Sequence, residues 1–201
     1  MSGPMHTLII GGQKSGKSRH AEHLAAHWLA QPGHAATLIA TAQAWDDEMR
    51  ARIERHQQER LQRAPGLHTV EEPLQLPSVI AERSRADTLL VVDCLTLWLT
   101  NWLMPITLDP ATIDDAAHLR KRRQHWQQAR ADLLGALAQA PGPVVFVSNE
   151  MGWGVMPLGR AVRAFADELG ALNQMLAAHC PQVLLMAAGL PMPLKSAPPG
   201  V

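Results

Sequence analysis

Residues 11–18 constrain the fold more than any other part of the chain. They read GGQKSGKS and match the pattern G-x-x-x-x-G-K-[ST]. A short apolar run at residues 6–10 precedes them, and residues 17–30, with helical spacing of apolar positions, follow. Glycines between a strand and a helix let successive backbone N–H groups point at a phosphate, and the helix N-terminus adds partial positive charge. The segment therefore predicts a phosphate-binding loop at the edge of a sheet.

The side chains of this segment, called the phosphate loop below, indicate how a nucleotide would be held. Lys17 is expected to neutralise the β- and γ-phosphates, and Ser18 to complete the shell of a Mg²⁺ ion. Asp93 directly follows the apolar residues 89–92 and is the expected second metal ligand. These features predict binding of a nucleoside triphosphate but leave the reaction open, because such loops serve kinases, switches, motors and transporters. The loop residues expected at the nucleotide are Gly11, Gly12, Gln13, Lys14, Ser15, Gly16, Lys17 and Ser18.

Apolar stretches alternate with helical stretches along the chain. The expected strands are apolar throughout, which is typical of strands buried on both faces of a parallel sheet. We therefore predict a single α/β domain over residues 1–201, with a mostly parallel central sheet flanked by helices, a ragged start at residues 1–5 and a tail at 196–201. The expected strands span residues 6–10, 36–41, 88–92, 144–148 and 183–188, and the expected helices 17–30, 46–63, 114–140 and 158–176.

The charge balance and the composition exclude several classes of partner. The chain of 201 residues has 18 Lys and Arg against 18 Asp and Glu, so its formal charge is zero. Binding to nucleic acid or to an anionic membrane needs clustered basic charge, so neither is an expected partner. Apolar residues make up 47% of the chain, and two cysteines provide no disulfide framework. With neither a secretory leader nor an apolar run of bilayer length, the expected location is the cytoplasm.

A basic helical face is the first feature beyond the phosphate loop. Arg52, His56 and Arg60 are spaced four residues apart within the expected helix 46–63, so they share one side of it. Two guanidiniums favour the neutral form of an imidazole between them and can also bind a phosphate, which suits a nucleophilic histidine. The alternative is a charged face that lies in solvent, and the pattern alone leaves both open.

A polar loop follows the expected strand 144–148. Asn149 and Glu150 lie at its carboxyl end, where open α/β sheets bind ligands. Glu150 is a candidate for orienting or deprotonating the hydroxyl that accepts a phosphate. The alternative is a structural role in shaping a glycine-rich connection that contains Gly152 and Gly154.

Taken together, these segments resemble one family. From the first strand to Lys195, the sequence resembles the bifunctional adenosylcobinamide kinase / adenosylcobinamide-phosphate guanylyltransferase family of cobalamin biosynthesis. The segments that carry the resemblance are residues 11–19, 40–43 and 46–49, Arg52-Ile53-x-x-His56-x-x-x-Arg60, residues 93–98 with Asn101, Asn149-Glu150-x-Gly152-x-Gly154-x-x-Pro157, and Asn173-Gln174.

The resemblance implies a RecA-like P-loop NTPase fold and two reactions in one chain. In the first, ATP or GTP phosphorylates the hydroxyl on the aminopropanol arm of adenosylcobinamide. In the second, His56 attacks the α-phosphate of GTP, expels pyrophosphate and passes GMP to the new phosphate, giving adenosylcobinamide-GDP. Relatives are homotrimers in which the histidine-bearing helix lies near a subunit boundary. The nucleotide contacts implied outside the phosphate loop are Thr41, Ala42, Gln43, Gln57, Gln58, Glu59, Arg60, Glu71 and Asp93.

The chain departs from the family pattern in two places, and two other functions stay open. Residues 60–71 form a longer stretch, which leaves Glu71 and Glu72 as alternatives for one nucleotide-binding carboxylate, and residues 104–116 look like an insertion without a function. A P-loop small-molecule kinase without guanylyltransferase activity would carry an arginine-rich lid, for which residues 120–123 are the candidate. A non-catalytic nucleotide-dependent switch would carry an Asn-Lys-x-Asp element, which the sequence lacks.

Overall fold

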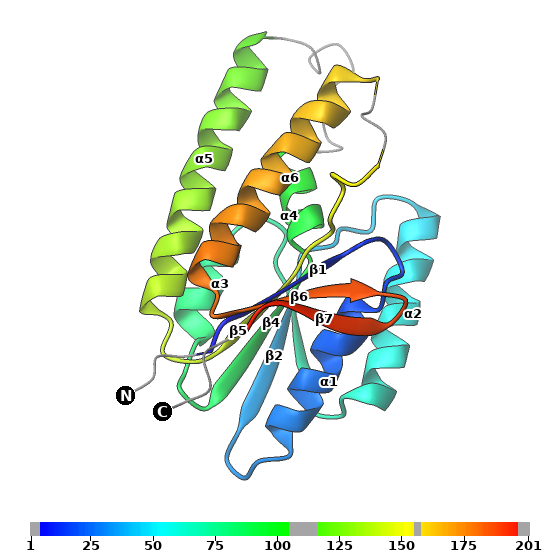
Figure 1. Cartoon of the computed structure of the whole chain (residues 1–201), viewed down its shortest axis with the longest axis vertical. Helices are drawn as coiled ribbons and strands as arrows, with labels where there is room; N and C mark the ends of the chain where they lie inside the picture. Colours follow the sequence, from blue (N-terminus) through cyan, green and yellow to red (C-terminus); the bar gives the residue numbers. More distant parts are fainter. Residues whose placement is uncertain (1–4, 105–115, 155–157, 197–201) are drawn as a thin grey trace.

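The five apolar stretches predicted as strands lie together in one sheet (Figure 1). The computed structural model describes residues 5–104, 116–154 and 158–196. Residues 1–4 of the expected ragged start, residues 105–115 of the insertion, Pro157 and the tail from residue 197 lie outside the described residues. The strands are β1 (Thr7–Gly11), β2 (Ala35–Ala40), β3 (His68–Glu71), β4 (Thr88–Asp93), β5 (Val144–Val147), β6 (Gln182–Ala187) and β7 (Leu190–Lys195). The helices are α1 (Lys17–Leu29), α2 (Asp47–Arg63), α3 (Leu76–Arg83), α4 (Leu95–Leu103), α5 (Ala116–Gln139) and α6 (Arg160–His179).

The order of the strands places the predicted site residues together at the edge where the parallel strands end. The order is β3-β2-β4-β5-β1-β6-β7, and neighbouring strands are parallel except for β6 and β7. β5 lies between β1, which leads into the phosphate loop, and β4, which ends on Asp93. Because these strands are parallel, the phosphate loop, Asp93 and the loop after β5 all follow carboxyl ends at the same edge. The predicted α/β fold of the RecA-like P-loop class is confirmed.

Helices cover both faces of the sheet and bury a core on each side. On one face, α3, α4, α5 and α6 enclose a cluster in which Trp98 and Trp126 meet edge to face, with ring centroids 5.0 Å apart. On the other face, α1 packs through the fully buried Ala21 and Ala25. Burial on both faces explains why the strands are apolar throughout. None of the helices in the described parts of the chain is long and apolar enough to cross a membrane.

Several elements differ from those that the sequence patterns predict. β3 and α3 are short and partly exposed, so neither has a clear apolar pattern. α4 is hidden in the sequence because one apolar run crosses Asp93 and conceals the change from strand to helix. β7 is a strand that the apolar patterns do not predict, and Pro191 and Pro193 are tolerated there because β7 is an edge strand. The prediction that Leu158 belongs to an apolar helix face is wrong: α6 begins at Arg160, and Leu158 is 97% exposed.

Candidate nucleotide-binding and transfer site

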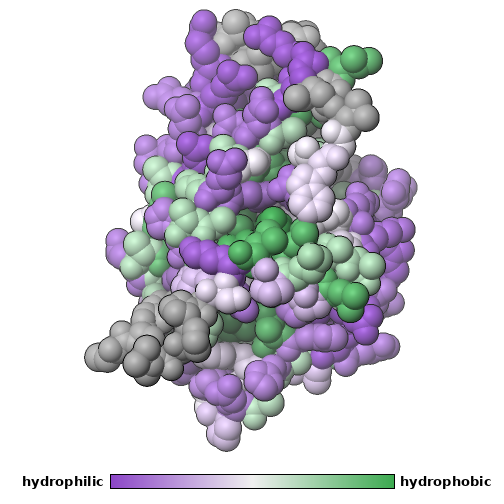
Figure 2. Space-filling view, viewed as in Figure 1, coloured by the Kyte–Doolittle hydropathy of each residue, from purple (hydrophilic) through white to green (hydrophobic). Residues whose placement is uncertain are grey.

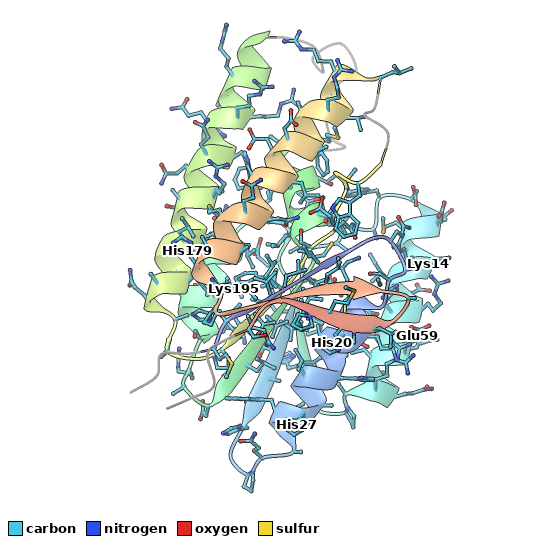
Figure 3. All side chains as sticks on the ribbon, in the orientation of Figure 1. Lys14, His20, His27, Glu59, His179 and Lys195 are labelled. Atoms are coloured by element: carbon cyan, nitrogen blue, oxygen red, sulfur yellow. The ribbon has the colours of Figure 1, made fainter. Side chains whose placement is uncertain are left out.

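Two glycines with left-handed backbone set the shape of the phosphate loop. Gly11 ends β1 with φ 151°, and Gly16 precedes α1 with φ 99°. A Cβ atom on Gly11 would lie 2.5 Å from the carbonyl oxygen of Met186, so a larger residue would collide with backbone. Lys14 lies exposed at the outer end of the loop (Figure 3). The loop therefore keeps the glycine-dependent backbone that phosphate binding needs.

Lys17 is the first residue of α1 and is buried beneath the phosphate loop. Its Nζ donates a hydrogen bond to the carbonyl oxygen of Gly12 at 2.7 Å. Burial lowers the pKa of its ammonium, Cys94 and Asp93 raise that pKa, and Arg52 lowers it. Charges from the end of β4 and from α2 therefore act on Lys17 together. Lys17 and Asp93 thus lie at the carboxyl edge of the sheet, with Arg52 of α2 among the charges that act on Lys17.

Ser18 and Asp93 fit the predicted Mg²⁺ ligands in type and position. Ser18 lies in the first turn of α1 and Asp93 at the end of β4, and both are half-buried. A hydroxyl and a carboxylate oxygen are hard ligands of the kind that Mg²⁺ prefers, with water and substrate phosphate supplying the rest of its shell. Among the described residues, no three His, Cys, Asp or Glu side chains group as a metal cluster. By ligand type and position, Ser18 and Asp93 fit an ion that takes its other ligands from water and nucleotide phosphate.

Thr41 is a structural brace beside Asp93. Its Oγ1 donates to the carbonyl oxygen of Cys94 at 2.7 Å and accepts from Cys94 N at 3.0 Å, and its own N donates to Asp93 O at 3.1 Å. Asn101 Nδ2 donates to Thr41 O at 2.9 Å. Every polar atom of this fully buried residue is therefore engaged by protein. Of its neighbours on the same loop, Ala42 is half-buried, and Gln43 is exposed and accepts a bond from Trp45 Nε1 at 3.2 Å.

Glu150 shapes the loop after β5 and joins it to the phosphate loop. Its N donates to Gly11 O at 3.1 Å, and its carboxylate Oε1 accepts from Gly152 N at 2.9 Å. On the same loop, Asn149 O accepts from Asn173 Nδ2 of α6 at 3.0 Å. The loop-shaping alternative therefore has a direct contact in its support. The half-buried carboxylate also lies at the carboxyl edge, as a base for an acceptor hydroxyl would.

The basic face of α2 turns toward the domain. Arg52 and His56 are half-buried and Arg60 is buried, whereas Gln57 and Gln58 on the other side of the helix are exposed. The partial burial of Arg52 and His56, together with the effect of Arg52 on the pKa of Lys17, favours a face that turns toward the phosphate loop over one that lies free in solvent.

Arg60 is buried and contacts residues of α1 and β3, whereas Arg52 is half-buried. Arg60 Nη1 donates to Thr69 Oγ1 at 3.1 Å, and its Nε lies 3.6 Å from Glu22 Oε1. Glu22, on α1, is buried and also binds Arg63. Sequence patterns do not reveal Glu22 as a site residue. The available signal is a carboxylate directly beside Ala21, one of the buried alanines of α1.

The structure separates the two candidate carboxylates after β3. Glu72 Oε1 accepts from Leu74 N at 2.8 Å and Gln75 N at 2.7 Å, so it stabilises the turn into α3. Glu71 is exposed at the carboxyl end of β3 and pairs in register with Ala40 of β2. Its place at the ligand-binding edge makes Glu71 the better candidate for contact with a nucleotide.

Comparison with known proteins decides among the functions that this geometry allows. Residues 7–194 match the family described as cobinamide kinase / cobinamide phosphate guanyltransferase. The chain belongs to this family. The match spans the phosphate loop, α2, Asp93 and the Glu150 loop, and it confirms the resemblance and the enzyme class predicted from the sequence.

Members of the cobinamide kinase / cobinamide phosphate guanyltransferase family with similar sequences come from several bacteria. The "Bifunctional adenosylcobalamin biosynthesis protein CobP" of Pseudomonas aeruginosa is 45% identical over 194 residues, which cover 96% of this chain and 99% of the relative. Proteins named "Bifunctional adenosylcobalamin biosynthesis protein CobU" are 36% identical in Salmonella typhimurium and 35% in Escherichia coli, each over 95% of this chain and all of the relative. The family description names both a kinase and a guanyltransferase, in agreement with the main prediction and not with a non-catalytic switch.

Proposed function

We propose that this chain phosphorylates adenosylcobinamide with ATP or GTP and then transfers GMP from GTP to that phosphate through a guanylyl-histidine. The observation that carries the proposal is the buried Lys17, whose Nζ lies 2.7 Å from Gly12 O inside the phosphate loop, in a family match that spans residues 7–194. Incubation with adenosylcobinamide and γ-labelled ATP, followed by α-labelled GTP, tests both reactions. The γ label should appear in the cobinamide phosphate and the α label in adenosylcobinamide-GDP. A product that never takes the α label would support the kinase-only alternative.

In the kinase step, positioning and charge neutralisation supply most of the catalysis. Backbone N–H groups of the phosphate loop would hold the triphosphate, and Lys17 would neutralise its β- and γ-phosphates. Ser18 and Asp93 would hold Mg²⁺, which draws charge from the phosphate oxygens. The acceptor hydroxyl forms a bond to the γ-phosphorus as the bond to the β–γ bridging oxygen breaks. Glu150 would take the hydroxyl proton.

In the guanylyl transfer step, His56 is the proposed nucleophile. A ring nitrogen of neutral His56 would form a bond to the α-phosphorus of GTP while the bond to pyrophosphate breaks. A phosphate oxygen of the cobinamide phosphate then attacks the same phosphorus, the P–N bond breaks, and GMP passes to the acceptor. Arg52, on the same helix face, would stabilise the charge on the α-phosphate. The covalent intermediate replaces one difficult displacement by two easier ones.

The remaining proposed nucleotide contacts differ in exposure. Glu71 and Gln43 are exposed at the carboxyl edge of the sheet and can meet the nucleotide of their own subunit. Gln57 and Gln58 face outward on α2, and contact through them would come most simply from a nucleotide at a boundary with a second subunit. We propose that three further residues contact the nucleotide through their backbone or act on it indirectly by supporting Arg52 and His56. They are Ala42, Glu59 and Arg60. Thr41 would act by fixing the position of Asp93.

Glu150 to Gln is expected to lower the kinase rate about a hundredfold while leaving the melting temperature unchanged. The glutamine side-chain oxygen can still accept the bond from Gly152 N, so the loop keeps its shape, but it cannot take a proton. Kinase turnover and thermal unfolding measured on the same sample separate the two roles. A stable variant with full kinase activity would leave Glu150 with the loop-shaping role alone.

Asp93 to Asn is expected to lower kinase turnover about a hundredfold and to weaken nucleotide binding much less. The carboxylate would serve the metal, while the phosphate loop holds the nucleotide. The backbone bond from Thr41 N to Asp93 O does not involve the side chain, so the brace is preserved. Turnover measured across a series of Mg²⁺ concentrations should show a higher Mg²⁺ requirement in the variant. An unchanged Mg²⁺ dependence would remove Asp93 from the metal site.

We also propose that the enzyme is a homotrimer that works in the cytoplasm, where its nucleotides are available. An exposed apolar stripe on β7 supports an assembly: Leu190, Met192 and Leu194 are 68%, 51% and 56% exposed. Figure 2 shows hydrophobic side chains gathered over the side of the sheet that ends in strand β7. Exposed apolar patches of this kind occur more often at protein–protein contact surfaces than on the rest of a protein surface. Sedimentation of the purified enzyme measures the number of chains.

A further inference from the structure

A buried carboxylate joins the helix of the phosphate loop to the helix of the proposed nucleophile. Glu22 on α1 is 1% exposed. Its Oε2 accepts from Arg63 Nη1 at 3.1 Å, and its Oε1 lies 3.6 Å from Arg60 Nε. Glu59 adds a second partner for Arg63, with Oε2 2.8 Å from Nη2, and Figure 3 shows Glu59 on α2 beside α1. All three charged partners of this cluster lie on α2.

Ion pairs, rather than an apolar core, hold α2 against α1. The one buried side chain on α2 is Arg60, and the other residues of the helix are exposed or half-buried. A helix packed through leucines can adjust its rotation by small shifts, whereas a buried carboxylate needs its cations at fixed positions. Together with the bond from Arg60 to Thr69, the pairing with Glu22 therefore constrains the rotation and depth of α2.

The same cluster fixes which way the basic face of α2, which carries His56, points. Arg60 follows His56 by one helical turn on the same side of α2, and Arg63 follows within a further turn. Glu22 lies on α1 only five positions after Lys17, so one rigid helix carries both the phosphate-holding lysine and the carboxylate. Glu22 therefore links the helix of the phosphate loop to the helix that carries His56.

We propose that Glu22 is a positioning residue for guanylyl transfer, because it holds α2 so that His56 faces the α-phosphate of the nucleotide in the phosphate loop. This inference rests on the proposed function, in which His56 serves the guanylyl step and the kinase step does not use it. Loss of the Glu22 charge should therefore slow guanylyl transfer selectively. A general loss of folded protein would instead lower both rates in proportion.

The test compares two rates within each protein sample. Glu22→Gln keeps the size of the side chain but removes its charge, and Arg63→Gln, which removes a half-exposed partner, is the milder second variant. Glu168→Gln is the matched control, since Glu168 accepts from Trp126 Nε1 at 2.9 Å and lies 3.5 Å from Arg130, away from α2. For each protein we would measure labelling by α-labelled GTP, kinase turnover, and hydrogen exchange of the α2 amides.

The ratio of guanylyl labelling rate to kinase rate is expected to fall about tenfold or more in Glu22→Gln, and less in Arg63→Gln. Exchange of α2 amides should rise in both variants, and Glu168→Gln should keep the wild-type ratio. If Glu22→Gln does not fold, Arg63→Gln decides. An unchanged ratio in the folded variants, with normal labelling of the wild type, would overturn this inference alone. A wild type that takes no label would overturn the proposed nucleophile and the inference with it.

Discussion

Replacing Lys17 with alanine is expected to abolish both transfers, with rates falling about a thousandfold or more. Each reaction needs the triphosphate fixed and its charge neutralised, and Lys17 is the buried cation at the N-terminus of α1. Its ammonium already lies inside the loop, where Nζ binds Gly12 O, so it is preorganised to meet phosphate oxygens. Backbone N–H groups remain in the variant, and binding of the nucleotide should weaken less than turnover.

The measurement is kinase turnover and guanylyl transfer by the purified variant, with nucleotide affinity determined separately. Arg83→Ala provides the control, because Arg83 is an exposed cation in the last turn of α3. It should behave as the wild type in both reactions. Near-normal kinase turnover by Lys17→Ala would refute the assignment of residues 11–18 as the catalytic phosphate loop.

Replacing His56 with alanine is expected to lower guanylyl transfer by about three orders of magnitude or more while the kinase step stays close to normal. The reason is that the two proposed reactions depend on different residues of the site. The kinase step uses the phosphate loop and Asp93, whereas the proposed P–N bond forms on a ring nitrogen of His56. His56 is half-buried on the face of α2 that approaches Lys17 through Arg52.

Exposed histidines supply the control for this variant. His27 lies near the end of α1 and is exposed, so His27→Ala should keep both activities. Both variants are assayed for cobinamide phosphate and for adenosylcobinamide-GDP. Equal losses of the two products in His56→Ala would point to a structural defect, and retention of guanylyl transfer would place the nucleophile at another residue.

The local parts of this fold can be predicted from the sequence because their determinants are contiguous. A strand, a glycine-rich turn and a helix follow one another in residues 7–29, so the motif and its surroundings can be recognised together. Asp93 is predictable for the same reason, since it ends a fully apolar strand. The four-residue spacing of Arg52, His56 and Arg60 reveals a shared face on a helix. It does not reveal that this face turns toward the domain.

The parts that escape prediction depend on contacts between distant segments. Glu22 and Arg63 are 41 positions apart, and only the packing of α1 against α2 makes them partners. The hydrogen bonds between Thr41 and Cys94 likewise join the ends of β2 and β4, a structural role that the sequence patterns do not predict for Thr41. β7 is missed for a different reason: its prolines are unfavourable in a sheet except at an edge, and edge position is a property of the whole sheet.

The central claim, that His56 carries a covalent guanylyl group, can be measured directly on the wild-type protein. The enzyme is incubated with α-labelled GTP and Mg²⁺ without a cobinamide acceptor, denatured, divided between mild acid and mild base, and digested for peptide mapping. A phosphorus–nitrogen bond to imidazole is labile in acid and stable in base. We therefore expect label that survives denaturation and base, disappears in acid, and maps to the α2 peptide containing His56. Label that resists acid, maps to another peptide or never forms would contradict the account.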